Sequence, residues 1–185
     1  MATIVARTVD RLRTAGVMVE PGLHDSEFER IESSLGFLFG DEHRALLAEV
    51  LPVGENWPHW RRLSVAEAQK WLGQPTAGIV FDVRENDFWP AAWGQRPSDR
   101  SVAEDVARHQ LARAPQLVPI WGHRFVPAAP APVPSPVFSV WGTDVIYYGD
   151  NLLDYVAYEF RTGPRQPTRG GPRRVPFWSD LAERT

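Results

Sequence analysis

Helix-like and strand-like patterns occupy different parts of this 185-residue chain. Before residue 73, apolar side chains recur at helical spacing, whereas the later segments contain short branched or aromatic runs bounded by Gly or Pro. The predicted strands are IVFDV (79–83), LVPIW (117–121), HRFV (123–126), VFSVW (137–141) and DVIYY (144–148). Helices followed by strands predict an α+β fold, in which N-terminal helices pack on a mainly antiparallel sheet of about five strands.

Helix boundaries are indicated by capping residues and by glycines. His24 or Asp25 is expected to cap a helix that ends at Gly36, and Asp41 is expected to cap the next helix. The tetrapeptide SVAE occurs at 64–67 and again at 101–104. Each copy predicts a capping box, in which Ser accepts from a backbone amide and Glu accepts from the Ser amide. The two boxes are expected to start helices of roughly 9 and 14 residues.

The segment PVFSVWGTDVIYYGDNLLDYVAYEF, residues 136–160, predicts a hairpin followed by a closing C-terminal helix. Gly142-Thr143 separates the two strands, and Gly first in a two-residue loop is typical of a type II′ turn. Gly149 ends the second strand, and Asp150 or Asn151 caps the helix. The residues expected in the core are Phe28, Ile31, Leu46, Leu47, Ile79, Phe81, Val145 and Phe160.

Length and charge divide the chain into a domain and a tail. We expect a single domain over 1–163 and a basic tail rich in Pro, Gly and Arg over 164–185. Residues 1–160 carry 21 Asp and Glu against 14 Lys and Arg, a charge of −7, and residues 161–185 carry 2 against 6, a charge of +4. The tail is expected to be solvated, although FWSDL at 177–181 could dock as a short helix.

Several classes of chemistry find no support in the sequence. There is no cysteine, no G-x-S-x-G motif, no Gly-rich phosphate loop with Lys and no H-E-x-x-H motif, and the five His residues are scattered. We therefore expect no catalysis, no cofactor and no metal site. The N-terminal segment is interrupted by charges and no run approaches ~20 apolar residues, so a cytoplasmic protein without a membrane segment is expected. The acidic body argues against nucleic acid as the main ligand.

Tryptophan is unusually frequent, with eight residues. Trp71 and Trp121 lie in a predicted helix and strand and are expected in the core. Tryptophans on polar loops are compatible with burial or with exposure as binding anchors. The loop tryptophans are Trp57, Trp60, Trp89 and Trp93.

A candidate binding face follows from strand alternation. In the predicted hairpin Asp144 and Tyr148 share one face, and Asp82 points away from Phe81 if 79–83 is a strand. The sequence thus predicts an acidic, aromatic patch that binds a protein partner. Its candidate residues are Trp57, Trp60, Asp82, Trp89, Trp93, Trp141, Asp144 and Tyr148. Two alternatives stay open for the carboxylates of Asp82 and Asp144: a structural role in fixing turns, or convergence as a hydrolase pair.

The order of five segments resembles the Smi/Knr family of cell-wall-assembly regulators within the SUKH superfamily. The segments are GLHDSEFERIESSLGFLF (22–39), EHRALLAEVLPVGENWPHWR (42–61), GIVFDVRENDFW (78–89), LVPIWGHRFVP (117–127) and the stretch 136–160. The chain departs from the family pattern at three places. His24 replaces a Ser or Thr cap, Gly40 replaces a Pro, and Trp141-Gly142 replaces a His-Gln pair.

This resemblance implies a single α+β domain that is not an enzyme. Bacterial relatives act as immunity proteins that bind toxins, and fungal relatives act as regulators of cell-wall synthesis. The leading expectation is a protein that neutralises a toxin by direct binding, and the acidic body suits a basic toxin. A regulatory or scaffold module of cell-wall metabolism is the alternative, and a hydrolase ranks third. The sequence does not choose between a monomer and a dimer.

Overall fold

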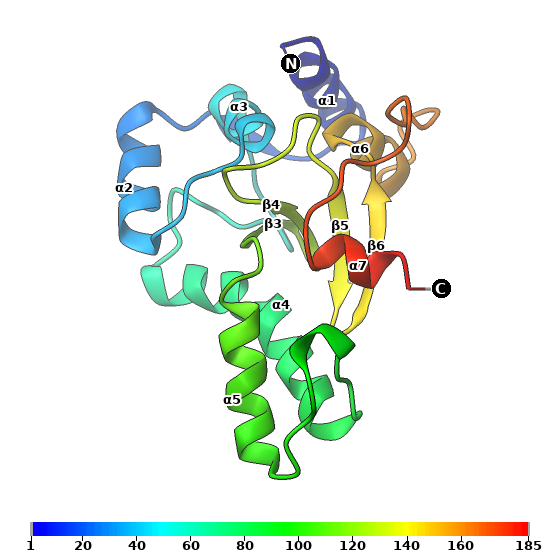
Figure 1. Cartoon of the computed structure of the whole chain (residues 1–185). Coiled ribbons are helices and arrows are strands. Elements are labelled where there is room, and N and C mark those ends of the chain that lie inside the picture. Colours follow the sequence, from blue (N-terminus) through cyan, green and yellow to red (C-terminus); the bar gives the residue numbers. More distant parts are fainter. Residues whose placement is uncertain (1, 185) are drawn as a thin grey trace.

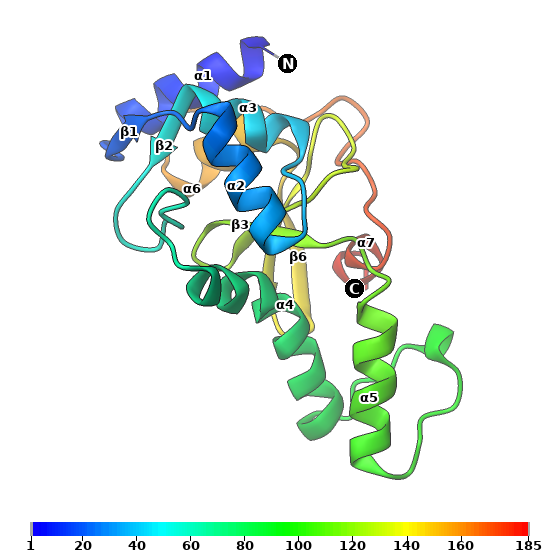
Figure 2. The ribbon, with the colours of Figure 1, turned by 90° about the vertical axis from the view of Figure 1, so that its left-hand side faces the viewer.

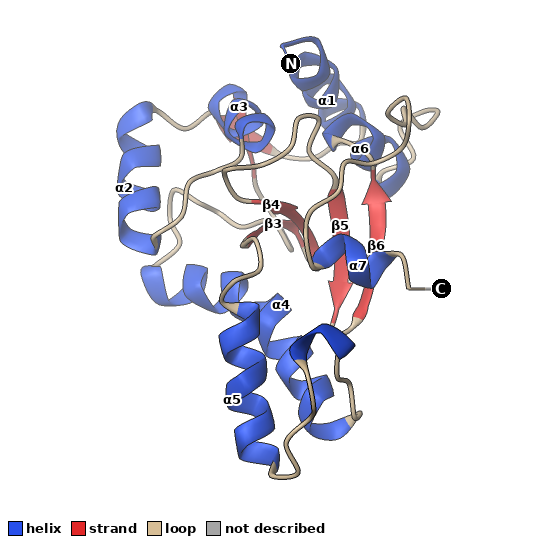
Figure 3. Ribbon diagram, viewed as in Figure 1, coloured by secondary structure: helices blue, strands red, loops and turns tan. Residues whose placement is uncertain are grey.

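The computed structural model describes residues 2–184, which form an α+β fold as expected (Figure 1; Figure 3). Helices and strands alternate in the first half, and the larger sheet is built in the second half. The elements are α1 (Ala2–Thr14), β1 (Val19–Pro21), α2 (Asp25–Leu35), α3 (Asp41–Glu49), β2 (Val50–Pro52), α4 (Val65–Glu85), the 3-10 helix η1 (Ala91–Trp93), α5 (Arg100–Leu111), β3 (Leu117–Trp121), β4 (Arg124–Pro127), β5 (Val137–Trp141), β6 (Asp144–Gly149), α6 (Leu152–Glu159) and α7 (Trp178–Ala182).

The main sheet has four antiparallel strands in the order β3-β4-β5-β6, and a separate two-stranded sheet joins β1 to β2. Consecutive strands are neighbours, so the main sheet is a meander with two tight turns. One turn connects the paired residues Trp121 and Arg124, and the other connects the paired residues Trp141 and Asp144. The expected five strands become four because residues 79–83 belong to α4 and not to the sheet.

Residues 79–83 are helical because they lie inside α4, which runs for 21 residues from its Ser64 cap. The periodicity predicts a helix of only roughly 9 residues after this cap. The helix instead continues past Pro75 and bends along its length (Figure 2). Ile79 and Val83 face the core on one side, whereas Phe81 is 51% exposed and the prediction that it is buried was wrong. A short apolar run fits a strand and a buried helix equally well.

Helix caps were predicted with mixed success. Ser64 forms the expected capping box with Glu67, whose carboxylate accepts the Ser64 amide at 2.9 Å. His24 caps α2, and its amide donates to Glu27 at 2.9 Å. The second SVAE box was wrong, because α5 begins at Arg100 and its cap is Asp99.

Gly40, and not Asp41, is the N-cap of α3. A side chain at Gly40 would place its Cβ 2.8 Å from the carbonyl oxygen of Pro127, so the close approach of β4 requires glycine there.

Two hydrophobic clusters form the interior. The first joins α1, α2 and α3 to β3, β4 and α6 and contains Phe28, Ile31, Leu46 and Leu47, all as expected. The second joins α4, α5 and α7 to the inner face of β5 and β6 and contains Ile79 and Val145. Phe160 is only partly buried against the first cluster. Helices α4 and α5 lie side by side at one end of the molecule, and α1 and α6 lie together at the other (Figures 1 and 2).

The C-terminal segment is held against the domain at two places. Arg165 forms an ion pair with the buried Asp154 of α6 at 2.6 Å. Further on, α7 packs on β6, where Trp178 and Leu181 are buried in the second cluster. The FWSDL segment therefore docks on its own chain, and the expectation of a solvated extension does not describe this part of residues 164–185.

Candidate functional site

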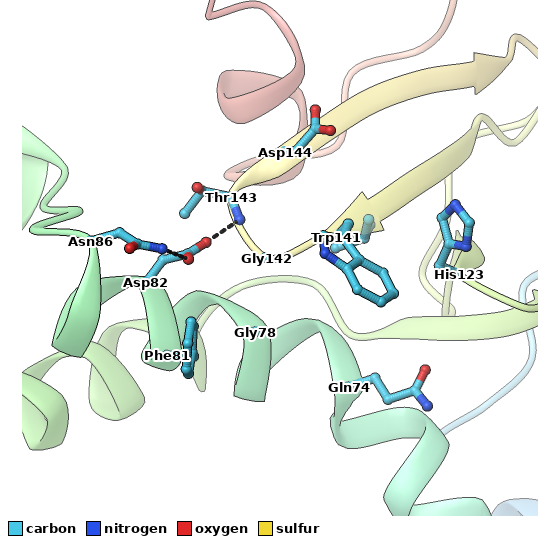
Figure 4. Close-up of a pocket in the computed structure, with 11 residues that line it drawn as sticks. Gln74, Gly78, Phe81, Asp82, Asn86, His123, Trp141, Gly142, Thr143 and Asp144 are labelled. Atoms are coloured by element: carbon cyan, nitrogen blue, oxygen red, sulfur yellow. Dashed lines mark hydrogen bonds between the residues drawn. The ribbon is translucent and has the colours of Figure 1, made fainter.

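A groove of about 680 Å³ lies between α4 and the β5–β6 turn (Figure 4). The α4 wall consists of Gln74, Gly78, Phe81, Asp82 and Asn86. The sheet wall consists of His123, Val140, Trp141, Gly142, Thr143 and Asp144. Gln74, Gly78, Asp82 and Asn86 recur every four residues, so a single face of α4 forms the first wall.

The two walls meet where the backbone of the turn rests on α4. A Cβ added to Gly78 would lie 3.0 Å from backbone atoms of Gly142. Gly142 itself has a φ of 59°, and a Cβ there would lie 2.3 Å from the Oδ2 atom of Asp82. Glycine is therefore required at both positions, for close approach at Gly78 and for both approach and backbone conformation at Gly142. The positive φ of Gly142 fits the predicted type II′ turn.

Asp82 holds the turn in place. Its Oδ2 accepts the Thr143 amide at 2.6 Å, and its Oδ1 accepts the Asn86 side-chain amide at 2.6 Å (Figure 4). The side chain is nearly enclosed, since Asp82 is 9% exposed. Both oxygens are engaged within the chain, and this geometry supports the turn-fixing role that the sequence left open for Asp82. It also gives a physical reason for glycine at position 142, because any larger side chain there would collide with this carboxylate.

Trp141 is the most exposed large apolar side chain in residues 2–184, at 75%. It stands at the end of β5 opposite Asp144, its cross-strand partner. The edge of its indole meets the His123 ring at a centroid distance of 5.9 Å. In Figure 4 the indole lies over the groove, while the Asp144 carboxylate stands at the rim.

Asp144 is exposed and, within residues 2–184, makes no side-chain hydrogen bond or ion pair. The structure therefore separates the roles of the two predicted carboxylates: Asp82 fixes the turn, and Asp144 is available to solvent.

His123 is the one imidazole that lines the groove. Burial lowers its pKa below the usual 6.5, the neighbouring Arg124 lowers it further, and Glu159 partly opposes both effects. The ring is therefore mostly neutral at pH 7. Within residues 2–184, no three His, Asp or Glu side chains are placed to hold a metal ion. In the same range, no helix is both long enough and apolar enough to cross a membrane.

Trp57 and Trp60 lie away from the groove, so the prediction that they border the patch was wrong. Trp60 is 2% exposed and packs edge-on against Phe39 in the first cluster, at a centroid distance of 5.1 Å. Trp57 is half-buried and stacks on Phe160 at 6.0 Å. Both residues lie on the single loop from β2 to α4, which packs against the aromatic residues of the first cluster.

Trp89, Trp93 and Tyr148 also lie outside the groove lining. Trp89 donates its indole N–H to the Gly94 carbonyl at 2.8 Å, and Trp93 stacks on Phe177 at 6.1 Å, so these two rings close the end of the second cluster. Tyr148 lies on the same face as Asp144, but its ring is covered by the Arg124 guanidinium at 3.7 Å. Of the eight predicted residues, the structure thus brings together Asp82, Trp141 and Asp144.

Six lining side chains were not among the predicted binding residues: Gln74, Phe81, Asn86, His123, Val140 and Thr143. A signal for the α4 residues was present, because Gln74, Gly78, Asp82 and Asn86 are spaced by four. It is meaningful only if the segment is read as one helix through Pro75. His123 and Thr143 line the groove together because the meander places the β3–β4 and β5–β6 turns at the same end of the sheet. No local sequence pattern indicates this.

Comparisons of the chain with family models, with curated proteins and with solved structures gave no match. The resemblance to the Smi/Knr family stays a prediction, and the groove itself carries the functional argument.

Proposed function

We propose that this chain is a non-enzymatic protein-binding domain of the immunity type, which neutralises a toxin by docking the Trp141 groove on it. The observation that supports this most is the exposure of Trp141, 75% on an ordered turn. Trp is among the residue types most enriched at the energetic centres of protein interfaces. Phe81, 51% exposed across the groove, enlarges the apolar surface.

The rigidity of the site also supports docking. Asp82, Gly78 and Gly142 fix the turn on α4, so Trp141 is presented on a backbone that has little freedom to lose on binding. Preorganisation of this kind raises affinity because less entropy is lost when the complex forms.

The negative charge of the domain supports a basic partner. Residues 1–160 carry −7, and the groove lining contains two carboxylates and neither Lys nor Arg. Complementary charge accelerates association and disfavours acidic partners. A basic toxin therefore fits this face better than an acidic protein does.

The test is to clone the reading frames that flank the gene of this chain and to express each with and without the chain. We expect one product to arrest growth alone, to be tolerated with the chain, and to co-purify with it. Trp141→Ala should restore the arrest and weaken binding by more than about tenfold. Met18→Ala, which changes a side chain that is 66% exposed outside the groove, is the control and should protect as well as wild type.

Two outcomes would contradict the proposal. If no flanking product is toxic or binds, the regulatory or scaffold role in cell-wall metabolism takes its place. If a toxin binds and Trp141→Ala leaves its affinity unchanged, the docking face lies elsewhere on the molecule.

A further inference from the structure

We infer that the rim of the Trp141 groove receives an arginine side chain of the partner, which lies along the Trp141 indole and ends on the Asp144 carboxylate. This inference rests on the proposed function and names the chemistry that its docking face recognises. The two residues are cross-strand partners in register and both line the groove. Figure 4 shows the Asp144 carboxylate turned away from the indole, and no hydrogen bond within residues 2–184 fixes it there. One extended side chain that crosses the turn therefore meets both groups once the Asp144 side chain rotates toward the ring.

Arginines inside this chain are already bound in this way. Arg124 lies 3.7 Å from the centre of the Tyr148 ring and pairs with Glu159 at 2.9 Å. Arg165 lies 4.7 Å from the centre of the Tyr158 ring and pairs with Asp154 at 2.6 Å.

Two more arginines follow the same pattern. Arg44 lies 4.0 Å from the centre of the Phe28 ring and pairs with Asp25 at 2.9 Å. Arg84 lies 5.6 Å from the centre of the Phe81 ring and pairs with Glu85 at 2.6 Å. An aromatic ring beside a carboxylate is thus an arginine site four times in this fold.

Trp141 and Asp144 are a fifth pair of ring and carboxylate, and here the cation is missing. Within residues 2–184 no guanidinium or ammonium lies over the Trp141 ring, and Asp144 has no cationic partner. Trp binds cations more strongly than Tyr or Phe does. The pair therefore has the composition of the internal arginine sites without their arginine.

The surroundings favour a cation and disfavour an anion. Asp82, in the α4 wall of the groove, adds a second negative charge, and its position is fixed by hydrogen bonds from Thr143 and Asn86. His123 faces Trp141 as a mostly neutral ring at pH 7, because burial lowers its pKa. Arginine suits the site better than lysine, since its planar fork can stack on an indole and donate two hydrogen bonds to a carboxylate.

The experiment uses the full chain labelled with ¹⁵N and follows the indole N–H signals while N-acetyl-arginine amide is added. The matched control is N-acetyl-citrulline amide, which has nearly the same shape and no charge. The Trp141 signal, assigned by its loss in Trp141→Phe, should shift saturably with arginine at a Kd of about 1–10 mM, the range for a single side chain. Citrulline should bind at least about fivefold more weakly, because the cation–π and ion-pair contacts are lost.

Variants locate the effect. Asp144→Asn should weaken arginine binding by about three- to tenfold and leave citrulline unchanged, since it removes the ion pair but not the ring. Asp105→Asn, on the exposed side of α5, makes the same change in net charge and should alter neither. Equal binding of arginine and citrulline, or no saturable shift of Trp141, would overturn the inference. So would a shift produced by a disaccharide of N-acetylglucosamine and not by arginine amide.

These outcomes can be separated from those of the toxin experiment. If arginine amide does not bind while Trp141→Ala still abolishes protection, the docking face stands and the arginine site falls. If arginine amide binds at Trp141 and the toxin does not need Trp141, the arginine site stands and the proposed function falls.

Discussion

The two turns of the main sheet have closely similar sequences and different surroundings. The β3–β4 turn reads Trp-Gly-His-Arg at 121–124, and the β5–β6 turn reads Trp-Gly-Thr-Asp at 141–144. In both, the glycine has a positive φ, 52° at Gly122 and 59° at Gly142. The two glycines therefore have similar conformations, and the turns differ most in the parts of the chain that cover them.

The β3–β4 turn is covered by other parts of the molecule. The amide of Gly122 donates to the Asn56 carbonyl at 2.8 Å, so the loop before α4 closes over it. Trp121 packs on Phe160 at 5.9 Å, and Arg124 is buried between Tyr148 and Glu159.

The β5–β6 turn is contacted by α4 from one side only, and Trp141 and Asp144 are left exposed. The tryptophan and the charged residue of the β3–β4 turn are contacted by other parts of the chain, whereas the tryptophan and the charged residue of the β5–β6 turn face solvent. The exposed turn is nevertheless fixed by Asp82, so Trp141 and Asp144 are available for a partner on an ordered backbone.

The largest effect is expected at the covered turn, from Arg124→Ala. Removing one partner of a buried pair leaves Glu159 without its cation and uncovers Tyr148, so unfolding free energy should fall by about 3 kcal/mol. Denaturant titration measures it. Arg84→Ala removes an arginine with the same ring and carboxylate contacts at an exposed site, and should cost less than about 0.5 kcal/mol. Similar losses in both variants would show that burial of Arg124 adds nothing to the pair.

The second effect compares the two glycines. Gly122→Ala and Gly142→Ala both force a side chain into the left-handed region, at a cost of about 1 kcal/mol each. A Cβ at Gly122 meets no atom within 4 Å, whereas at Gly142 it lies 2.3 Å from Asp82. Gly142→Ala should therefore cost about 1–2 kcal/mol more in thermal or chemical unfolding, from the added clash. Equal costs would mean that Asp82 moves aside freely and does not hold the turn.

Local sequence patterns predicted the turn, strand and cap features that depend on neighbouring residues. The Gly142-Thr143 turn, the strands beside it and the Asn151 cap of α6 follow from a few neighbouring residues each. The alternation along β6 also placed Asp144 on the outer face and Val145 on the inner one, as the structure has them.

The surroundings of each turn depend on distant segments and were not predictable in this way. IVFDV was predicted as a strand because a run of five mostly apolar residues is too short to distinguish a strand from a buried helix. As a result, Asp82 was assigned to the sheet and not to α4. Trp60 lies on a polar loop and was a candidate binding residue, and Trp141 ends a strand, yet Trp60 is 2% and Trp141 75% exposed. Trp60 is buried because the loop between β2 and α4 packs it against Phe39, a contact between segments that no local pattern indicates.

A smaller effect is expected when pH falls below the folded pKa of His123. Because this pKa is lowered in the folded chain, the neutral ring's contribution to stability is present above the unfolded value of 6.5 and is lost as pH falls through the folded pKa. The imidazolium formed below that pKa faces Trp141 beside Arg124, so arginine amide should bind several-fold more weakly there than at pH 7. His123→Gln should remove most of this pH dependence in the same NMR titration. A dependence that persists in His123→Gln would assign it to the carboxylates of the groove.

The smallest effect on stability is expected at the exposed turn itself. Trp141→Ala removes a side chain that is 75% exposed and has one aromatic neighbour, so unfolding free energy should change by no more than about 0.5 kcal/mol. Trp121→Ala is the matched change at the covered turn, and it should cost about 2 kcal/mol because it removes the contact with Phe160. Parallel denaturant titrations give both values. If Trp141→Ala destabilises the chain as much as Trp121→Ala does, Trp141 serves the fold, and its exposure is no sign of a partner. If the two separate as expected, the wild-type chain gains almost no stability from a large apolar side chain at position 141, and binding is the property that such a side chain serves.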